Sequence, residues 1–306
     1  MKEIKDVVII GAGPAGMSAA VYASRSSLST VIIESGAPGG KLLKTSDIEN
    51  YIGEKMVNGF ELANKMYEHA LSFGASHMYG NVVELENLGD TKKITLEDGS
   101  EVEAKTVIIA TGTQEQLLNI KGESEYTGRG VSYCAVCDAA FFRGKEVAVI
   151  GGGNSALEEA LYLTKFADKV HVIIRRDVFR AEALVVKHVE ENPKIEIHRL
   201  RKPKEILGDG SKVTGIVLMD SNTGEEETLA LDGIFPFVGA LPVTAFANGL
   251  DIVDERGYLV VNDKMETAIP GIYGAGDVCA KPLRQIVTAV SDGAIAGQQC
   301  YHYING

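Results

Sequence analysis

Two segments of the chain, separated by 140 residues, have the same sequence pattern. In each segment a run of β-branched residues leads into a glycine-rich turn and then into a helix-like stretch, first over residues 5–24 and again over residues 145–164. The residues that coincide after the shift are Lys5 with Lys145, Gly11 with Gly151, Gly13 with Gly153, and Tyr22 with Tyr162. A repeat of a whole strand, turn and helix predicts two copies of one folding unit, and a chain of 306 residues is long enough for two domains.

The glycine turn of each copy is typical of a dinucleotide-binding fold. In the first copy Gly11 permits the tight turn, Gly13 lets a pyrophosphate approach the backbone, and Gly16 lets the helix pack closely on the strand. The helix that follows directs its free backbone N–H groups at the phosphates. The candidate phosphate-binding residues are Gly11, Gly13, Pro14, Ala15 and Gly16 in the first copy, and Gly153, Asn154 and Ser155 in the second.

The residue that ends the second strand differs between the copies, and this difference predicts different nucleotides. In the first copy a β-branched run leads to Glu34, about twenty residues after the turn, where a carboxylate accepts hydrogen bonds from a ribose diol. The shift places Ile174 at this position in the second copy, followed by Arg175, Arg176 and Arg180. Arginine binds a 2′-phosphate that a carboxylate would repel, so the second site is predicted to hold NADP. A solvated basic patch is the alternative explanation of these arginines.

Between the two copies lies a pair of cysteines, Cys134 and Cys137, at the spacing of a redox-active disulfide. Two thiols at this spacing can form a disulfide with little movement of the backbone. Metal binding is the alternative, but a structural zinc site normally needs four ligands, and Cys279 and Cys300 stand alone. The pair therefore favours dithiol chemistry, and we expect no metal site.

The remaining pattern predicts an α/β fold with two Rossmann-like domains, the second inserted into the first, each with a small β-meander. In the first half we expect a helix over 58–73, capped by Asn58, and strands over 81–86, 92–97 and 101–109. In the second half we expect a helix near 182–191 and a meander made of the runs 195–199, 203–207, 212–219 and 226–237. Towards the end we expect strands over 257–261 and 271–273, and a helix from Arg284.

The composition argues against several classes of partner. The net charge of −12 disfavours nucleic acid and anionic membrane surfaces, and no apolar run approaches the roughly 18 residues of a membrane span. The first residues lead directly into a strand without the pattern of a secretion signal. Four cysteines, two of them paired closely, are typical of a reducing compartment. We therefore expect a cytoplasmic protein.

Together these motifs resemble the bacterial-type, low-molecular-weight thioredoxin reductases over essentially the full length of the chain. The resemblance is carried by Gly11 to Gly16, Glu34, Gly39-Gly40 with Asn50, Ala110-Thr-Gly112, Cys134-Ala-Val-Cys137-Asp138, Gly151 to Ala156, Arg175-Arg176 with Arg180, and Gly274-Ala-Gly-Asp277 with Arg284-Gln285. It implies FAD and NADPH as cofactors, thioredoxin as the disulfide substrate, and a homodimer. It also implies an FAD-binding domain formed by 1–113 and 244–306, and an NADPH-binding domain with the cysteine pair over 114–243.

The resemblance also implies a role for each matching residue. Cys137 would face the flavin, Cys134 would attack the thioredoxin disulfide, and Asp138 would serve as the acid–base group. An alternative for Asp138 is that it is simply a residue at a helix N-terminus near the thiols. The flavin would be held by Gly40, Lys41, Leu42, Asn50, Val83, Ala110, Thr111, Gly112, Gly276, Asp277, Arg284, Gln285 and Ile286, in addition to the first glycine turn and Glu34.

The sequence departs from the family pattern in a few places, of which Lys41 is the most informative. The family usually has glutamine there, and a cation near the ring would favour the reduced, anionic flavin. Two other functions are compatible with parts of the pattern. A ferredoxin-linked flavin thioredoxin reductase should lack the arginines, and a non-catalytic flavin-binding sensor should lack the cysteines. The chain retains both groups, which favours an NADPH-dependent enzyme.

Overall fold

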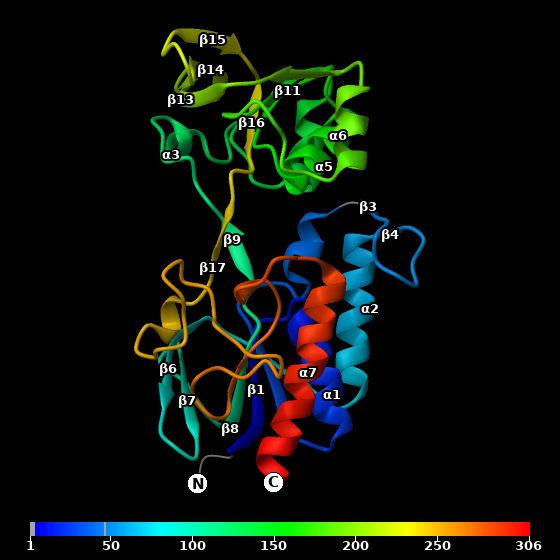
Figure 1. The fold of residues 1–306 in the computed structure, drawn as a ribbon, viewed down its shortest axis with the longest axis vertical. Helices are drawn as coiled ribbons and strands as arrows, with labels where there is room; N and C mark the ends of the chain where they lie inside the picture. The colour runs from blue at the N-terminus through cyan, green and yellow to red at the C-terminus, as the bar shows by residue number, and fades with distance from the viewer. Residues whose placement is uncertain (1–3, 46) are drawn as a thin grey trace. The chain divides into compact units, whose positions relative to one another are not determined.

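The computed structural model describes residues 4–45 and 47–306, and the chain divides into two compact units. Met1–Gln114 and Leu241–Gly306 form the first unit, and Glu115–Ala240 forms the second (Figure 1). The second unit is thus inserted into the first, and the expected α/β fold class is confirmed. The expected domain boundaries were 113/114 and 243/244. Within the described residues, no helix has the length and apolar character needed to cross a membrane.

The first unit is built on a parallel sheet whose strands come from distant parts of the chain. The order β5-β2-β1-β8 joins Ser76–Tyr79, Thr30–Glu34, Lys5–Ile10 and Glu101–Ile109, and β18, Ile272–Gly274, pairs with β8 as well. All these pairings are parallel, and the central strands are rich in buried valine and isoleucine. Such strands bury both faces, which is typical of a Rossmann-like sheet.

Strand β8 belongs to two layers of the first unit because its two halves pair with different strands. Its second half, from Ala104 to Ile109, pairs with β1, while its first half pairs antiparallel with β7, Lys92–Leu96. Strand β6, Val82–Asn87, completes this meander, and the turn between β7 and β8 contains Gly99 with a φ of +82°. The three expected strands and their hairpin turn are therefore confirmed.

Three helices cover one face of the first sheet: α1, Pro14–Arg25, α2, Gly59–Ser72, and α7, Ile286–Asn305 (Figure 1). The α1 and α7 backbones approach closely at two glycines. A Cβ at Gly293 would lie 2.0 Å from the Ala15 carbonyl oxygen, and one at Gly297 would lie 2.6 Å from the Ala19 carbonyl oxygen. Asn58 caps α2 as expected, because its side chain accepts a hydrogen bond from the Phe60 N–H.

The second unit repeats the same plan with four parallel strands in the order β12-β11-β10-β16. These are Ile195–His198, Lys169–Ile173, Glu146–Ile150 and Gly233–Pro236, and the helices α5, Asn154–Leu163, and α6, Ala183–Glu190, belong to the same unit. A separate antiparallel sheet contains β13, Arg201–Gly208, β14, Val213–Asp220, and β15, Glu226–Ala230. The apolar residues of α5 pack with β10 and β11 in one core.

The internal repeat is preserved in the strand register of the two units. Ile10 pairs with Ile33 in the first unit, and Ile150 pairs with Ile173 in the second, so the partners keep the same offset of 140 residues. The strands equivalent to β2 and β1 are β11 and β10, and they occupy the same places in the strand order. The prediction of two copies of one unit is confirmed.

Three strand expectations were wrong. The run 195–199 is not part of the meander, because β12 pairs in parallel with β11, and the run 226–237 splits into β15 of the meander and β16 of the parallel sheet. Residues 257–261 form no strand; Leu259 makes only isolated bridges, with Val253 and Cys279. The final helix begins at Ile286, two residues after the expected start, with Gln285 as its N-cap.

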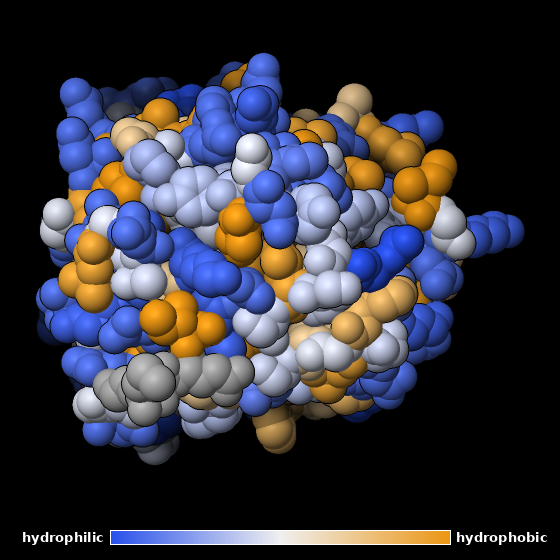
Figure 2. Space-filling model, turned by 90° about the horizontal axis from the view of Figure 1, so that it is seen from below, coloured by the Kyte–Doolittle hydropathy of each residue, from blue (hydrophilic) through white to orange (hydrophobic). Residues whose placement is uncertain are grey.

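Where the chain passes between the units, β9, Thr113–Glu115, pairs with β17, Ala240–Pro242. The remaining short elements are η1, Gly40–Lys44, β3, Asp47–Ile48, β4, Val57–Asn58, α3, Glu123–Tyr126, α4, Ala135–Asp138, η2, Ala139–Phe142, η3, Ala245–Ala247, and η4, Gly276–Val278. The face drawn in Figure 2 is mostly hydrophilic, with apolar side chains scattered among polar ones.

Candidate active site

The first glycine turn has the geometry of a phosphate-binding turn. Gly11 has a left-handed φ of +106°, and a Cβ there would lie 2.5 Å from the Ala110 carbonyl oxygen. A Cβ at Gly16 would lie 1.9 Å from the Gly11 carbonyl oxygen, so the helix can approach the turn only without a side chain. A Cβ at Gly13, in contrast, would meet no atom within 4 Å. The space beside Gly13 is therefore open to a ligand at the N-terminus of α1, where Pro14 and Ala15 begin the helix.

Glu34 lies at the end of β2 and is tied to the glycine turn. Its Oε2 accepts a hydrogen bond of 2.9 Å from the Ala12 N–H, and its Oε1 accepts one of 2.9 Å from the Gly36 N–H. Ser35 Oγ also donates to Oε1, at 3.4 Å, and because a carboxylate offers about four lone-pair positions, capacity remains for a ribose hydroxyl. The structure thus brings Glu34 and the turn together, as a dinucleotide site requires.

The loop after β2 lies over the same turn. The Gly39 N–H donates to the Ala12 carbonyl oxygen at 2.8 Å, and a Cβ at Gly40 would lie 3.3 Å from the Gly13 Cα. Lys41 Nζ donates to Thr113 Oγ1 at 2.7 Å, while Leu42 is buried in a small core with Ile48 and Leu62. Gly39 and Gly40 therefore lie against the first glycine turn, and Lys41 and Leu42 follow them directly in the chain.

Asn50 and Gln285, 235 residues apart in the sequence, are in contact. Asn50 Nδ2 donates to Gln285 Oε1 at 3.2 Å. Gln285 caps α7 through a capping box with Thr288, and Ile286 packs against the small core that contains Leu42. The loop after β2 and the start of α7 therefore form one local structure.

The carboxyl ends of β1, β8 and β18 meet beside the glycine turn. The Ala110 N–H donates to the Ile10 carbonyl oxygen at 2.8 Å, and the Ala275 N–H donates to the Ile109 carbonyl oxygen at 2.9 Å. Ligands of open α/β sheets bind at these ends. Ala110 and Gly276, which follow β8 and β18, are therefore well placed for a nucleotide.

Thr111 and Gly112 form hydrogen bonds with Val243, in the returning segment of the chain. Thr111 Oγ1 donates to the Val243 carbonyl oxygen at 2.7 Å, and the Val243 N–H donates to the Gly112 carbonyl oxygen at 3.2 Å. These bonds hold together the two chain segments at which the second unit leaves and rejoins the first.

Asp277 and Arg284 both lie in the segment between β18 and α7, and they are in contact. Burial raises the pKa of Asp277, and the nearby cations Lys41 and Arg284 act in the opposite direction. Arg284 donates to the carbonyl oxygens of Asp277 and Cys279, at 3.3 and 3.2 Å, and stacks over the Tyr258 ring at 4.4 Å. Lys41 is thus close enough to Asp277 to influence its charge.

The second glycine turn matches the first in its steric requirements. Gly151 has a φ of +146°, and a Cβ there would lie 2.2 Å from the Phe237 carbonyl oxygen, whereas one at Gly153 would meet nothing within 4 Å. Asn154 and Ser155 begin α5 directly after this open position. The space beside Gly153 can therefore admit a phosphate at the N-terminus of α5.

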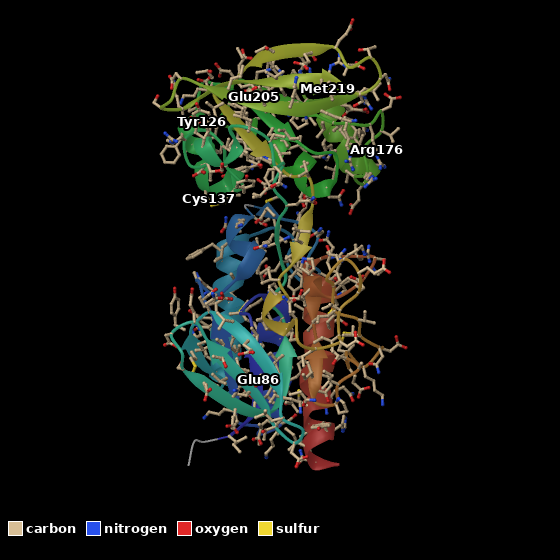
Figure 3. The ribbon with its side chains drawn as sticks, turned by 90° about the vertical axis from the view of Figure 1, so that its left-hand side faces the viewer. Glu86, Tyr126, Cys137, Arg176, Glu205 and Met219 are labelled. Atoms are coloured by element: carbon tan, nitrogen blue, oxygen red, sulfur yellow. A yellow bond between two sulfur atoms is a disulfide. The ribbon has the colours of Figure 1, made fainter. Side chains whose placement is uncertain are left out.

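The segment after β11 folds back onto the second turn. The Arg180 N–H donates to the Gly152 carbonyl oxygen at 2.7 Å. Glu182 exchanges two hydrogen bonds with Asn154, of 2.7 and 3.0 Å. Arg175, Arg176 and Arg180 are all exposed, and within residues 4–45 and 47–306 none of their guanidinium groups forms an ion pair. These cations are available to an anionic ligand beside the glycine turn; Figure 3 labels one of them, Arg176.

Cys134 and Cys137 form a disulfide with a Cα–Cα distance of 5.3 Å. Cys134 is the N-cap of α4, and its Sγ accepts a hydrogen bond of 3.2 Å from the Cys137 N–H. Ser132 Oγ in turn accepts a bond of 3.1 Å from the Cys134 N–H. Cys137 is exposed (Figure 3), and half-buried Asp138 follows it at the end of α4. A backbone N–H directed at sulfur stabilises a thiolate when the disulfide opens.

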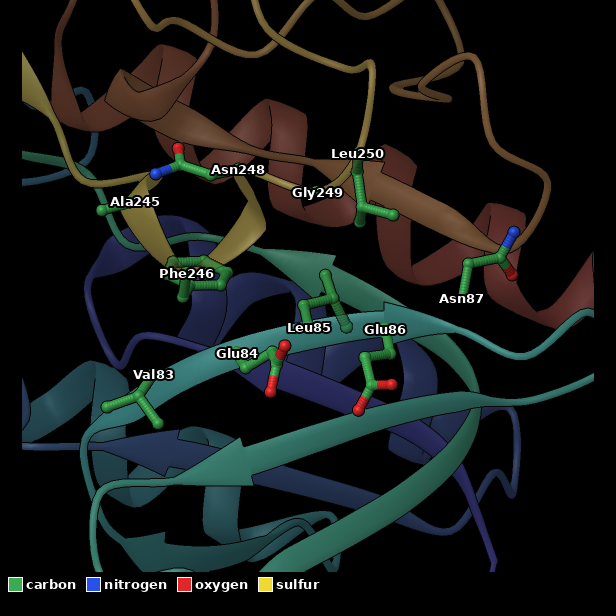
Figure 4. Close-up of a pocket in the computed structure, with 10 residues that line it drawn as sticks. All are labelled: Val83, Glu84, Leu85, Glu86, Asn87, Ala245, Phe246, Asn248, Gly249 and Leu250. Carbon is green, nitrogen blue, oxygen red and sulfur yellow. The ribbon is translucent and has the colours of Figure 1, made fainter.

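Val83 lies on β6, four residues after Tyr79, which pairs with Glu34 in the strand register. It lines a pocket between β6 and residues 245–250, together with Glu84, Leu85 and Phe246 (Figure 4). Val83 is on β6 of the meander, and none of the glycine-turn residues lines this pocket. This pocket is therefore distinct from the first glycine turn.

Two positioning residues were not predicted from the sequence. Asp292, on α7, accepts a hydrogen bond of 2.9 Å from the Gly276 N–H and forms a buried ion pair with Lys281. The Ser132 hydroxyl positions Cys134 by accepting a hydrogen bond from the Cys134 backbone N–H. Both act through contacts that depend on the fold, and only the short distance from Ser132 to Cys134 could have suggested the second.

Comparison with known proteins places these sites in a family. Residues 5–293 match the family model described as pyridine nucleotide-disulphide oxidoreductase. The chain belongs to this family. Pyridine nucleotide-disulphide oxidoreductases use a flavin and a pyridine nucleotide, so membership agrees with the two nucleotide turns and the cysteine pair. The family expected from the sequence is confirmed.

Among the family members most similar to the chain are thioredoxin reductases. That of Bacillus subtilis (strain 168) is 48% identical over 303 residues, covering 99% of this chain and 96% of the relative. A solved thioredoxin reductase of Lactococcus lactis is 48% identical, with a TM-score of 0.97 over 98% of this chain and 99% of that one. The solved thioredoxin reductase of T. acidophilum is 39% identical, with a TM-score of 0.95 over the full length of both chains.

Proposed function

We propose that the protein is a thioredoxin-disulfide reductase that passes two electrons from NADPH through FAD to the Cys134–Cys137 disulfide and then to oxidised thioredoxin. The observation that carries this proposal is the redox-active pair in a chain with two register-matched nucleotide units. Bound FAD would accept a hydride from NADPH and deliver two electrons to the disulfide.

We assign FAD to the domain formed by 1–113 and 244–306. The open space at Gly13, the free lone pairs of Glu34 and the contact between Asn50 and Gln285 support this assignment. The pyrophosphate would lie at the N-terminus of α1, and the ribose at Glu34. Lys41 would add a positive charge near Asp277 in the same site.

We assign NADPH to the domain formed by 114–243. The open space at Gly153 would admit the pyrophosphate. Ile174, at the position equivalent to Glu34, offers no carboxylate that would repel a 2′-phosphate. Arg175 and Arg176, both exposed, would bind that phosphate through charge-assisted hydrogen bonds.

The cysteine pair would exchange electrons by ordinary thiol–disulfide chemistry. Two electrons and two protons open the disulfide to two thiols. Cys134, as a thiolate, would attack the thioredoxin disulfide, forming a mixed disulfide and releasing one thioredoxin thiolate. Cys137 would then attack Cys134 Sγ, which re-forms the pair and releases the second thioredoxin thiol. Asp138, next to Cys137, would carry a proton between the sulfurs and solvent.

The test is a comparison of the wild type with Cys137→Ser. The purified wild type should be yellow and should release thiols from oxidised thioredoxin only when NADPH is supplied. Cys137→Ser should still be bleached by NADPH, because flavin reduction needs no dithiol, yet it should not reduce thioredoxin. Thioredoxin turnover by this variant would refute the proposed electron path.

We also propose a homodimer, which sedimentation of the holoprotein would test.

A further inference from the structure

Three side chains with metal-binding groups gather on one face of the parallel sheet of the second unit. His171 is on β11, and Glu196 and His198 are on β12. His171 and Glu196 are direct partners in the strand register, and His198 is two residues further along the same face. One ligand atom from each residue lies within 4.8 Å of the other two. This cluster has no part in the proposed electron transfer.

The orientation of His171 is fixed by Glu146 on the neighbouring strand β10. Glu146 Oε2 lies 3.1 Å from His171 Nε2, and the His171 side chain is only 2% exposed. An ionised carboxylate can only accept a hydrogen bond, so the proton belongs to His171 Nε2. The Nδ1 lone pair of His171 therefore points the other way, towards His198 Nε2 at 2.9 Å. A carboxylate that orients a histidine in this manner is typical of metal sites.

Glu196 offers one oxygen to the two histidines. Its Oε1 lies 3.4 Å from His198 Nε2, while its Oε2 pairs with Lys169 Nζ on β11. Lys169 also brings a positive charge close to the cluster, which opposes a second cation. The ion pair nevertheless leaves Oε1 on the side of the histidines.

We propose that His171 Nδ1, His198 Nε2 and Glu196 Oε1 bind a divalent transition-metal ion such as Zn²⁺, with water in the fourth position. Two imidazole nitrogens and a carboxylate are a common zinc ligand set. Two nitrogens bound to one tetrahedral zinc lie about 3.3 Å apart, so the present 2.9 Å requires only a small movement of the less buried His198. Ca²⁺ and Mg²⁺ prefer oxygen ligands and are not expected here.

No change in net protonation of His198 is needed for binding. In the metal-free cluster its Nε2–H donates to His171 Nδ1. When the ion binds, the His198 proton moves to Nδ1 through solvent and Nε2 donates its lone pair to the metal. The ion would link β11 to β12 just before Ile174, whose N–H donates to the His198 carbonyl oxygen at 3.0 Å.

The test is a calorimetric titration of the oxidised, metal-free holoprotein with Zn²⁺, without nucleotide. The closed disulfide keeps Cys134 and Cys137 from binding zinc. We expect one saturable site per chain, whose affinity falls more than about 100-fold in His198→Gln and about 10–100-fold in Glu146→Ala, where only the orienting partner is lost. Lys169→Ala should bind more tightly, because a competing cation is removed.

His188→Gln is the matched control, because His188 is an exposed histidine on α6 of the same unit and should not affect binding. His171 is too buried to rely on, since its substitution could prevent folding. His198 and Glu196 are more exposed than His171, so His198→Gln and Glu196→Gln are expected to fold. Thermal melting of each variant would verify this. Absence of a saturable site, or undiminished binding in His198→Gln, would overturn the proposal. A zinc-edge anomalous peak between the three ligands would confirm it.

Discussion

The Glu34 carboxylate accepts a hydrogen bond of 2.9 Å from the backbone N–H of Ala12, in the middle of the first glycine turn. One side chain thereby joins the end of β2 to the turn after β1. The equivalent residue of the second unit, Ile174, is buried in the apolar core instead. The position predicted to bind ribose in the first unit is therefore a packing position in the second.

Glu34→Ala should therefore impair flavin binding in two ways, through the lost ribose contact and through a loosened turn. A hydrogen bond to a charged group contributes about 1.5–3 kcal/mol, so the flavin dissociation constant should rise roughly 10–100-fold. Flavin fluorescence during dialysis would measure the loss. Glu68→Ala, which removes an exposed carboxylate from α2, is the control and should retain its flavin. Equal retention in both variants would contradict the assignment of Glu34.

Arg175→Ala and Arg176→Ala should each reduce kcat/KM for NADPH by about 10–100-fold and leave the value for NADH nearly unchanged. The guanidinium groups are expected to contact only the 2′-phosphate, which NADH lacks. The loss should appear mainly in KM, because the phosphate is remote from the nicotinamide. Arg143→Ala removes an exposed arginine of the same unit and should behave as wild type. Wild-type use of both cofactors with equal efficiency would reject this role.

The proposed roles of Cys134 and Cys137 should be separable by trapping. A thioredoxin with a single cysteine, activated as an aromatic mixed disulfide, should form a covalent complex with Cys137→Ser and release the aromatic thiol. The attacking thiolate is then Cys134, whose Sγ receives the Cys137 N–H. Cys134→Ser should form much less complex. A non-reducing gel would show the products, and preferential trapping by Cys134→Ser would reverse the two roles.

Cys279 and Cys300 should be unreactive in the folded protein. They are 1% and 0% exposed, and burial raises the pKa of each thiol to about 12. At pH 8 an alkylating reagent should modify neither in the oxidised protein, because both thiols are inaccessible and protonated. Mass spectrometry should show no added mass until the chain is unfolded, when both react. Rapid modification of the folded, oxidised protein would contradict their burial.

The repeat made much of this fold predictable from the sequence. A glycine turn can be recognised from a short stretch of sequence, because its strand, turn and helix follow one another within about twenty residues. Gly11, Gly13 and Gly151 therefore have the expected geometry. The shift of 140 residues also identified Ile174 as the counterpart of Glu34, and the strand register supports that correspondence.

Features that depend on distant partners were not predictable. The run 195–199 could belong to a meander or to a parallel sheet, and only its pairing with β11 decides between them. Likewise, Asp292 reaches Gly276, and His171 meets His198, through the fold and not through a local pattern. The expectation of no metal site rested on cysteine spacing, which carries no information about histidines on neighbouring strands.

The hydrogen bonds between Thr111, Gly112 and Val243 have a consequence for how this architecture can be taken apart. They place the two cut ends of the first unit side by side, so that unit is complete in space although it is interrupted in sequence. A short bridge across these ends could replace residues 115–240 without stretching the chain. The second unit, which carries the cysteine pair, could therefore be removed or exchanged for another domain. The first unit would keep its own sheet and helices.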